Sequence, residues 1–257
     1  MTCVDVNTFL GHYPFHDFGE WDADILVQEM ERHGITESWI SWLPAIFSRD
    51  PSSGNGNLYR VAGSERRLRP VPAVHPGVSG WQDVVYDAVA RQAPCLRCDP
   101  TCYDLGTGSA EMTSLLALAA EQRLPLMMAV RLEDIRQRHP DDVTPELSPA
   151  MIRALIRCHA GARLIITHAD REFIEQVHFG STPDEASRIL WDISWIWGPP
   201  EDHLETLLGT VGMARFTFGT GTPLRLPETS LAKLDLLQLD ADDRRRIESG
   251  NLHEFLA

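Results

Sequence analysis

The sequence carries little positive charge and lacks a long apolar run. In 257 residues, 23 Lys and Arg stand against 37 Asp and Glu, which gives a formal net charge of -14. This charge opposes binding to the phosphate backbone of nucleic acids and to anionic membrane surfaces. Apolar segments such as 115–120 are interrupted by charged residues well before the ~20 residues that a membrane-spanning helix needs. We therefore expect neither nucleic acid nor a membrane as a partner.

The marks of a secreted protein are also missing. No basic region precedes an apolar stretch near the N-terminus. The cysteines are few and odd in number, which suits reduced thiols better than a disulfide framework. They are Cys3, Cys95, Cys98, Cys102 and Cys158. We expect a cytoplasmic protein.

Two kinds of cofactor motif are absent or poorly formed. Cys95, Cys98 and Cys102 have the spacing C-x2-C-x3-C, but the first two flank Leu96-Arg97 in a predicted strand, so their side chains point to opposite faces. An iron–sulfur cluster is therefore not expected. No G-x-G-x-x-G or G-x-x-x-x-G-K-[ST] follows the first predicted strand, which argues against an open nucleotide-binding sheet.

Short apolar runs alternate with amphipathic stretches from end to end, without a low-complexity linker. The predicted strands are Cys3–Asn7, Trp39–Ala45, Pro70–His75, Cys95–Cys98, Pro125–Arg131, Arg163–His168, Ile189–Trp195 and Arg215–Thr220. The predicted helices are Trp21–His33, Asn57–Arg66, Trp81–Arg91, Ala110–Gln122, Pro149–His159, Arg171–His178, Glu201–Leu208 and Leu231–Leu237. Eight strand–helix units predict the α/β class and a single (β/α)8 TIM barrel that spans residues 1–257.

Chemistry in such a barrel is carried by side chains where strands end. Side chains alternate along a strand, so an inward His168 in "LIITHAD" predicts an inward Ile166, with Ile165 and Thr167 facing the helices. The same reasoning brings several further polar residues to the mouth of the barrel. They are Asn7, His75, Arg97, Arg131, and Asp192 or Ser194.

The order of these segments resembles the amidohydrolase superfamily, specifically its amidohydrolase-related branch, which includes decarboxylases and lactone hydrolases. The matching segments are "VDVNTFLG", "RPVPAVHP", "CLRCDPTCYDL", "RLPLMMAVRLED", "ARLIITHAD", "FTFGTGTPL" and "IESGNLHEFL". The resemblance spans nearly the whole chain and implies the barrel fold and an activity on small molecules.

The metal ligands of that family are largely replaced in this chain. Asn7 and Phe9 stand where the resemblance places two strand-one ligands, Ala129 stands where strand five supplies a histidine, and Gly221 replaces the strand-eight aspartate. Of the usual set, His168 remains. A catalytic zinc site needs about three protein ligands with imidazole, carboxylate or thiolate donors. We expect no canonical metal centre and no cofactor; an unusual metal site built from His75, His139 and loop carboxylates is a weaker alternative.

Three residues are candidates for proton transfer. His168 suits a general acid or base because the ordinary histidine pKa of ~6.5 allows either protonation state near neutral pH. His75 or Asp134 is a candidate partner. The alternative for His168 is a hydrogen-bonded histidine in the barrel core, and for His75 a histidine at the rim.

Arg97 and Arg131 form the candidate anion clamp. Two inward guanidinium groups require carboxylate partners, either on a ligand or within the protein. A substrate carboxylate would suit their planar geometry. The internal alternatives are Asp5, Asp99, Glu133, Asp134 and Asp192.

Further side chains are candidates for contacting substrate. They are Asn7, His12, Tyr103, Arg136, His139, Asp192, Ser194 and Trp195, with Tyr13, Trp197 and Arg225 in the same predicted loops. Each is as suited to packing its own loop. The segment Phe47–Asn57 is predicted to be a mobile lid or a flexible connection.

The sequence predicts an enzyme that hydrolyses a small, carboxylate-bearing cyclic ester or amide without a binuclear metal centre. Two alternatives stay open: a nonoxidative decarboxylase or other lyase of the same superfamily, and a catalytically inactive protein that binds a small molecule. The partner is expected to be an anionic small molecule. A homodimer is compatible with the sequence but is not required by it.

Overall fold

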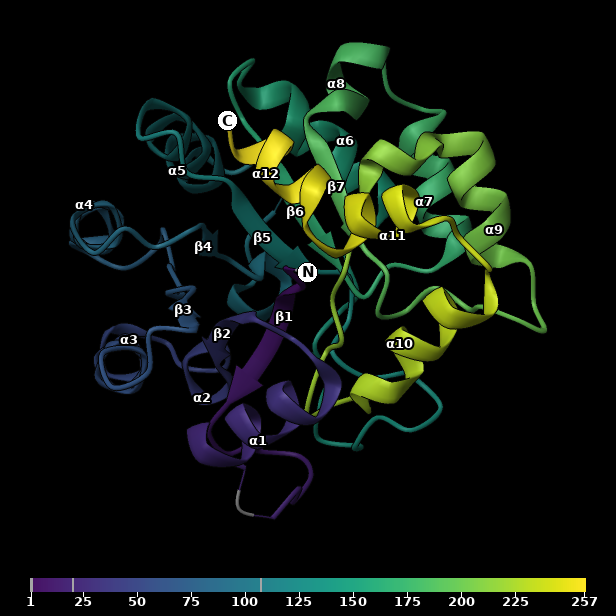
Figure 1. The fold of residues 1–257 in the computed structure, drawn as a ribbon. Helices are drawn as coiled ribbons and strands as arrows, with labels where there is room; N and C mark the ends of the chain where they lie inside the picture. The colour runs from purple at the N-terminus through teal and green to yellow at the C-terminus, as the bar shows by residue number, and fades with distance from the viewer. Residues whose placement is uncertain (1, 20, 107) are drawn as a thin grey trace.

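Parallel strands arranged around one axis form the centre of the molecule (Figure 1). The computed structural model describes residues 2–19, 21–106 and 108–257, and eight strands lie within these ranges. They are β1 (Val4–Leu10), β2 (Glu37–Trp42), β3 (Leu68–Pro70), β4 (Leu96–Arg97), β5 (Leu126–Ala129), β6 (Leu164–Thr167), β7 (Ile189–Asp192) and β8 (Phe216–Thr217). The predicted (β/α)8 barrel is confirmed.

Two short seams close the barrel. The ladders β1-β2-β3 and β4-β5-β6-β7-β8 are continuous. Ala73 bridges Arg97 at the first seam, where the Val74 amide donates to the Arg97 carbonyl at 2.8 Å. Thr8 bridges Thr222 at the second seam. The last strand therefore meets the first, and the carboxyl ends of all strands surround one mouth.

Helices surround the strands. They are α1 (Ala23–His33), α2 (Leu43–Ile46), α3 (Ser52–Ala62), α4 (Trp81–Ala90), α5 (Ala110–Glu121), α6 (Pro149–Cys158), α7 (Arg171–His178), α8 (Pro183–Ser187), α9 (His203–Leu207), α10 (Pro227–Leu236), α11 (Ala241–Arg245) and α12 (Asn251–Leu256). Asp22, Ser148 and Asp170 cap the helices that follow them, each accepting backbone N–H bonds with its side chain. Within the described ranges, no helix combines the length and apolar character needed to cross a bilayer.

The interior near the amino ends of the strands is an apolar layer. It contains Val4, Val6, Trp39, Val71, Cys95, Met127, Ile165 and Leu190, with Leu252 of α12 packed against them. A larger apolar cluster, which includes Cys98 and Ile166, lies between the strands and the helices. Cys95 and Cys98 therefore belong to different layers, as strand alternation predicts.

The predicted inward direction of Ile166 is wrong. Ile165 belongs to the interior layer, and Ile166 packs toward the helices. The reason is the backbone of His168, which has a left-handed φ of 57° just after β6 ends at Thr167. Alternation along the strand therefore does not extend to the His168 side chain.

The predicted mobile segment Phe47–Asn57 is largely ordered structure. Helix α3 begins at Ser52, and Gly54 is buried against α2. A Cβ on Gly54 would lie 2.6 Å from the Ala45 Cβ, so only glycine allows the two helices to approach this closely. Low helix propensity suggested a flexible loop, and tertiary packing overrides it.

Candidate functional site

Polar side chains gather at the mouth where the strands end. Asn7 comes from β1, Arg97 from β4, His168 follows β6, and Asp192 ends β7. His168 and Asp192 are completely buried, and Asn7 and Arg97 are 1% exposed. Buried polar groups are normally hydrogen-bonded, so their partners decide what each of these groups can do.

Asp192 links Asn7 to His168. One carboxylate oxygen accepts a bond from the Asn7 side-chain amide at 2.9 Å, and the other accepts the His168 backbone N–H at 3.1 Å. Burial raises the pKa of Asp192, and these hydrogen bonds act in the opposite direction. The Asn7 side-chain oxygen is buried without a partner. Asn7 thus serves as a donor to Asp192 and keeps a free acceptor.

The imidazole of His168 has one satisfied and one free nitrogen. Nδ1 lies 2.7 Å from the Arg131 carbonyl oxygen, which can only accept, so Nδ1 carries the proton. Nε2 is buried without a partner and holds a free lone pair. Burial lowers the pKa of His168 to about 3, the bond to the Arg131 carbonyl opposes this, and the charges of Arg97 and Arg225 lower the pKa further. His168 is therefore a neutral acceptor in this environment.

The left-handed φ of His168 is a second unusual feature of this residue. Histidine occupies that region more readily than most side chains but still at a cost of about 1 kcal/mol, and such conformations recur at functional sites. The bonds from its N–H to Asp192 and from its ring to Arg131 hold the conformation. The fold thus retains an unfavourable backbone conformation that directs the imidazole into the mouth.

Gly221 faces the free nitrogen of His168. Gly221 has a φ of 76°, and a Cβ at this position would lie 2.8 Å from His168 Nε2. Any side chain here would press on the imidazole and strain the backbone. At the position where the resemblance places an aspartate ligand, the present backbone accepts only glycine without a shift.

Arg97 is paired inside the barrel. Its Nε donates to Asp99 Oδ2 at 2.8 Å and its Nη1 to Ser41 Oγ at 3.3 Å. The guanidinium lies over the Phe9 ring, with Cζ 4.6 Å from the centroid, while Nη2 is buried without a partner. Asp99 also accepts the Ala129 N–H at 2.7 Å. Arg97 is therefore fixed in position, and the two N–H donors of its Nη2 remain free.

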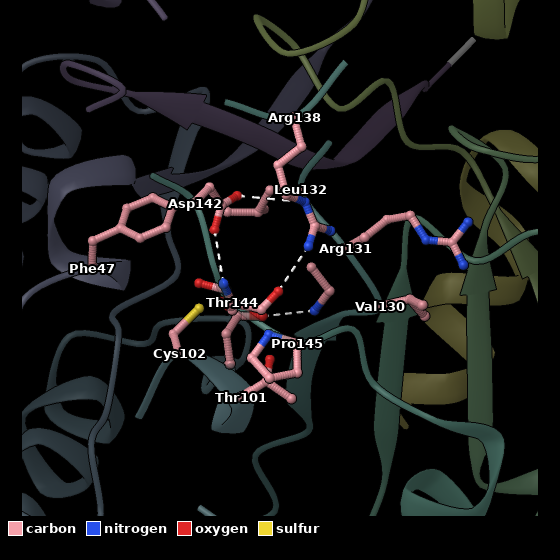
Figure 2. A pocket seen from close by; sticks show the side chains of 12 residues that line it. Phe47, Thr101, Cys102, Val130, Arg131, Leu132, Arg138, Asp142, Thr144 and Pro145 are labelled. Atoms are coloured by element: carbon pink, nitrogen blue, oxygen red, sulfur yellow. Dashed lines mark hydrogen bonds and ion pairs between the residues drawn. The ribbon is translucent and has the colours of Figure 1, made fainter. Parts of the chain in front are cut away.

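Arg131 pairs with a different set of carboxylates. Its Nη1 donates to Asp170 at 2.8 Å, and its Nε lies 3.1 Å from Glu146. Figure 2 shows its guanidinium pointing away from Cys102 and Asp142. Both arginines thus have internal partners, the alternative that the sequence left open. Their guanidinium groups also lie against different rings, since Arg131 is near Trp195 and Arg97 is over Phe9.

Arg225 adds a third positive charge near His168. Its Cζ lies 4.2 Å from the centroid of Trp195, and the Trp195 ring is 5.4 Å from the His168 ring. The Arg225 Nε is buried without a partner. Burial lowers the pKa of this guanidinium. Trp195 therefore lies against both Arg225 and His168 and forms one wall of the site.

Sequence reasoning missed Lys233, the one lysine in the sequence. Its Nζ donates to the carbonyls of Ile193 and Ser194, each at 2.9 Å. Burial lowers the pKa of Lys233 to about 7. These two hydrogen bonds link α10 to the segment after β7, which contains Ser194 and Trp195. The sequence offered only one indication, namely that the chain has a single lysine, and composition alone does not place a lysine near the site.

His75 and Tyr103 form a separate pair. Their rings stack at 4.2 Å with an interplanar angle of 8°, and His75 Nδ1 accepts the Gly77 N–H at 3.1 Å. Burial lowers the pKa of His75. Among the described residues, the hydrogen bonds and ring contacts of His168 involve Asp192, Arg131, Phe9 and Trp195. His75 is not among them.

The charged loop after β5 forms its own interactions. Asp134 accepts bonds from Arg136 Nε at 2.9 Å and Nη2 at 2.7 Å, and this pairing holds the pKa of Asp134 below its usual range. His139 stacks near Phe15 at 6.0 Å. His12 is exposed in the loop after β1. Asp134, Arg136, His139 and His12 thus lie toward the surface, and His168, Asp192, Asn7 and Arg97 occupy the interior.

Apolar side chains cover the mouth. The cluster consists of Phe9, Tyr13, Leu43, Ile46, Ala129 and Leu132, with Phe15, Phe47, Cys102 and Leu224 packed against it. The pocket of Figure 2, beside this cover, is a cavity of about 20 Å³, which has room for about one water molecule. The mouth is therefore closed in this structure.

The donors at the mouth do not fit the metal centre that the resemblance implies. His168 Nε2 and Asn7 Oδ1 are free, but both Asp192 oxygens accept hydrogen bonds, and Phe9, Ala129 and Gly221 supply no donor side chain. Zinc in a catalytic site takes about three protein ligands. One imidazole and one amide fall short of this set.

The fold is shared with solved structures, although no protein-family sequence model matches the chain and no curated protein sequence matches it. The 2,6-dihydroxybenzoate decarboxylase from Rhizobium is similar with a TM-score of 0.75 at 12% identity, over 99% of this chain and 98% of that one. A probable 2-pyrone-4,6-dicarboxylic acid hydrolase from Acinetobacter baumannii, with citric acid bound, gives 0.66 at 11% identity, over 100% and 99%. A zinc-bound amidohydrolase from Burkholderia multivorans gives 0.71 at 13% identity, over 100% and 99%.

Proposed function

We propose that this chain is an amidohydrolase-superfamily enzyme that hydrolyses a small cyclic ester or amide bearing a carboxylate. The observation that carries the proposal is the free, buried Nε2 of His168 beside fixed arginines at the carboxyl ends of the barrel strands. Active sites of (β/α)8 enzymes lie at this end. Similarity to a pyrone dicarboxylic acid hydrolase and to decarboxylases of aromatic acids supports a carboxylate-bearing ring as the substrate class.

Arg97 is the proposed anchor for the substrate carboxylate. Its Nη2 carries the free N–H donors of a guanidinium whose other side is held by Asp99 and Ser41. A fixed arginine gives up little freedom when it binds a carboxylate. Arg225, on the Trp195 side of His168, is the proposed second cation.

The bound carboxylate also changes His168. Burial is the main cause of the low pKa of His168, and the charges of Arg97 and Arg225 lower it further, so an anion that offsets these charges raises the pKa in part. His168 Nε2 then accepts a proton from water as the water oxygen attacks the ring carbonyl. The ring C–O or C–N bond breaks, and the proton passes from Nε2 to the leaving oxygen or nitrogen. One water is consumed, and the product is the ring-opened acid.

The cover must open for this reaction. Tyr13 and Phe15 lie on the loop after β1, and Phe47 follows α2. Displacing these rings would expose Phe9, Arg97 and His168 together. Loops that close over a bound substrate exclude water and strengthen the electrostatic interactions inside the site.

The test is turnover of a panel of monocyclic lactones and lactams with one or two carboxylates, including 2-pyrone-4,6-dicarboxylate. His168→Asn is the variant, because Asn tolerates the left-handed backbone. We expect a loss of about 100-fold or more in kcat/KM if His168 carries general acid–base catalysis. The matched control is His253→Gln, an exposed histidine of α12.

The same panel separates hydrolysis from its alternatives. Chelator treatment is expected to leave the rate of the folded enzyme unchanged; a rate lost to chelator and restored by zinc or manganese would contradict the proposed chemistry. Carbon dioxide release from 2,6-dihydroxybenzoate or a related acid would instead indicate a decarboxylase.

A binding protein without catalysis is the second candidate. The closed cover and the internal partners of Arg97 and Arg131 favour it. This function predicts saturable binding of a carboxylate-bearing ring, preserved in His168→Asn, with no turnover of any compound in the panel.

A further inference from the structure

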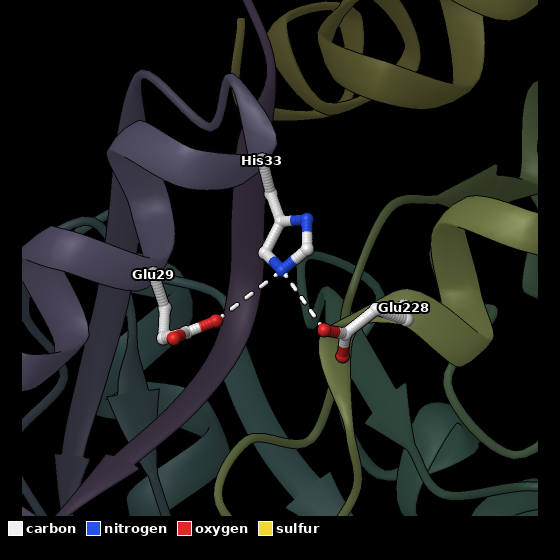
Figure 3. Close-up of side chains that lie close together, drawn as sticks. All are labelled: Glu29, His33 and Glu228. Carbon is white, nitrogen blue, oxygen red and sulfur yellow. Dashed lines mark ion pairs between the residues drawn. The ribbon is translucent and has the colours of Figure 1, made fainter.

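Three metal-ligating side chains meet on the outside of the barrel, away from the mouth. Glu29 and His33 lie one turn apart near the end of α1, and Glu228 lies in the first turn of α10 (Figure 3). Residues at i and i+4 share one face of a helix, so the Glu29 and His33 side chains point the same way. Their ligand atoms and that of Glu228 all lie within 4.8 Å of one another.

The spacing of these atoms matches a tetrahedral metal site. His33 Nε2 lies 3.2 Å from Glu29 Oε2 and 3.3 Å from Glu228 Oε1. Ligands at the usual zinc distances of about 2.0–2.1 Å are roughly 3.3 Å apart at the corners of a tetrahedron. The two distances involving His33, which are those of ion pairs, therefore also leave the ligand atoms where a bound ion would need them.

The free nitrogen of His33 is an independent observation. The His33 side chain is 12% exposed, and its Nε2 is buried and makes no hydrogen bond, although two carboxylate oxygens lie nearby. The nitrogen therefore points between Glu29 and Glu228 rather than at either oxygen. Figure 3 shows this nitrogen directed between the two carboxylates, which is the direction that a lone pair bound to a shared metal would take.

We propose that Glu29, His33 and Glu228 bind one Zn²⁺, with water as the fourth ligand. Imidazole nitrogen and carboxylate oxygen are both zinc ligands, and the two carboxylates supply two negative charges to the cation. The ion would join α1, which follows β1, to α10, which follows β8. These helices flank the seam where the last strand meets the first. The zinc would therefore stabilise the closure of the barrel.

Arg32 now occupies the outer side of this cluster. Its Nη1 lies 3.4 Å from Glu29 Oε1 and its Nη2 lies 3.7 Å from Glu228 Oε1. The Arg32 side chain is 65% exposed, so it can turn into solvent when a metal binds. A nearby guanidinium repels a divalent cation and competes for the carboxylates. Removing Arg32 should therefore tighten metal binding.

The experiment is a Zn²⁺ titration of the purified, metal-stripped full chain in competition with a metallochromic chelator. We expect one saturable equivalent, with affinity at least about 10-fold weaker in His33→Gln and in Glu228→Gln. Arg32→Gln should bind zinc several-fold more tightly. His253→Gln, which changes an exposed histidine elsewhere, should match the unmodified chain.

Thermal unfolding supplies a second readout. A ligand that binds only the folded chain raises Tm, so saturating zinc should raise Tm in the unmodified chain and not in Glu228→Gln. Glu228 is 47% exposed, which keeps this variant informative if His33→Gln folds poorly. Zinc removal should lower Tm without changing turnover, because these residues make no contact with His168; this separates the site from the proposed hydrolysis.

Three results would overturn the zinc site. The first is the absence of a saturable equivalent. The second is an affinity unchanged in both His33→Gln and Glu228→Gln. The third is an adventitious ion only: zinc binds only at millimolar concentration, and Arg32→Gln does not increase the affinity.

Discussion

The two ends of the barrel interior differ in how completely their atoms are satisfied. Near the amino ends of the strands, the interior layer is apolar, with Val4 of β1 and Leu190 of β7 among its members. Leu252 of α12 packs against this layer. At the carboxyl ends, polar atoms are buried without partners, among them His168 Nε2, Asn7 Oδ1 and Arg97 Nη2. Each unsatisfied polar atom costs about 1–3 kcal/mol. The first end supports folding, and the second keeps buried polar atoms that are available to a ligand or to water.

The largest expected loss of stability is at Arg97, because this residue of the polar end also stabilises the fold. Arg97→Met removes the cation from the buried pair with Asp99 and leaves a carboxylate without its partner. We expect a loss of about 3–5 kcal/mol in the free energy of unfolding, measured by urea denaturation.

The double variant Arg97→Met/Asp99→Asn is the control for that experiment. It removes both charges and should recover a large part of the lost stability while remaining unable to bind a carboxylate. If the single and double variants were equally unstable, the contribution of Arg97 to the unfolding free energy would not come from its ion pair with Asp99.

Leu190→Ala tests whether the apolar end contributes to stability without affecting ligand binding. Leu190 is completely buried in the interior layer. Removing its side chain leaves a cavity, and we expect a loss of about 3 kcal/mol in unfolding free energy. Ligand affinity of the folded fraction should stay unchanged. A large change in affinity with little loss of stability would contradict the separation of the two ends.

The pH dependence of stability reports on His168 directly. The folded pKa is about 3 against an ordinary 6.5, so between these values the unfolded chain binds one more proton than the folded chain. The contribution of His168 is therefore complete above about pH 6.5 and is lost as pH falls. We expect the difference in unfolding free energy between the unmodified chain and His168→Asn to shrink by about 1 kcal/mol per pH unit below pH 6.

The pKa of Asp5 is shifted upward, so its contribution to stability changes with pH in the opposite direction to that of His168. Burial raises its pKa to about 7, although Thr220 donates two hydrogen bonds to it. The folded chain therefore binds more protons than the unfolded chain between about pH 4 and 7, so Asp5 stabilises the fold more as pH falls. Asp5→Asn should steepen the acid loss of stability. A pH profile unaffected by either substitution would contradict both assignments.

Gly221→Ala should give a modest loss of stability and a large loss of binding. The left-handed φ costs about 1 kcal/mol for alanine, and the new Cβ would press on His168 Nε2. Gly34→Ala is the matched control, since Gly34 has a φ of 70° and open space around its Cβ position. Gly34→Ala should lose only the cost of the left-handed backbone, Gly221→Ala should lose more because of the contact with His168, and Gly221→Ala alone should weaken carboxylate binding in calorimetry.

The order of strands and helices could be predicted because it rests on local periodicity. The eight units and the place of His168 after strand six follow from short apolar runs and their boundaries. The direction of Ile166 could not be predicted, since it depends on a left-handed turn at His168 that strand alternation ignores. The helix at Ser52 could not be predicted either, because Gly54 is selected by contact with Ala45, a tertiary effect.

The partners of the site residues were the least predictable part. Asp99 lies two residues from Arg97, so its pairing was among the expected alternatives. Asp170 and Glu146 reach Arg131 from separate loops, and no local pattern reveals such contacts. The cover of Tyr13, Phe15 and Phe47 joins loops distant in the sequence, and it decides whether the mouth is open.

Lys233 offers a way to observe this molecule without an engineered label. The protein has a single ε-amine, and two backbone carbonyls after β7 hold it. The Nζ is partly buried against this segment, so an acylating reagent reaches the nitrogen fully only when the segment moves away. The rate of acylation at Lys233 therefore measures how often the segment that carries Trp195 detaches from α10, and a ligand that immobilises the mouth would slow that rate.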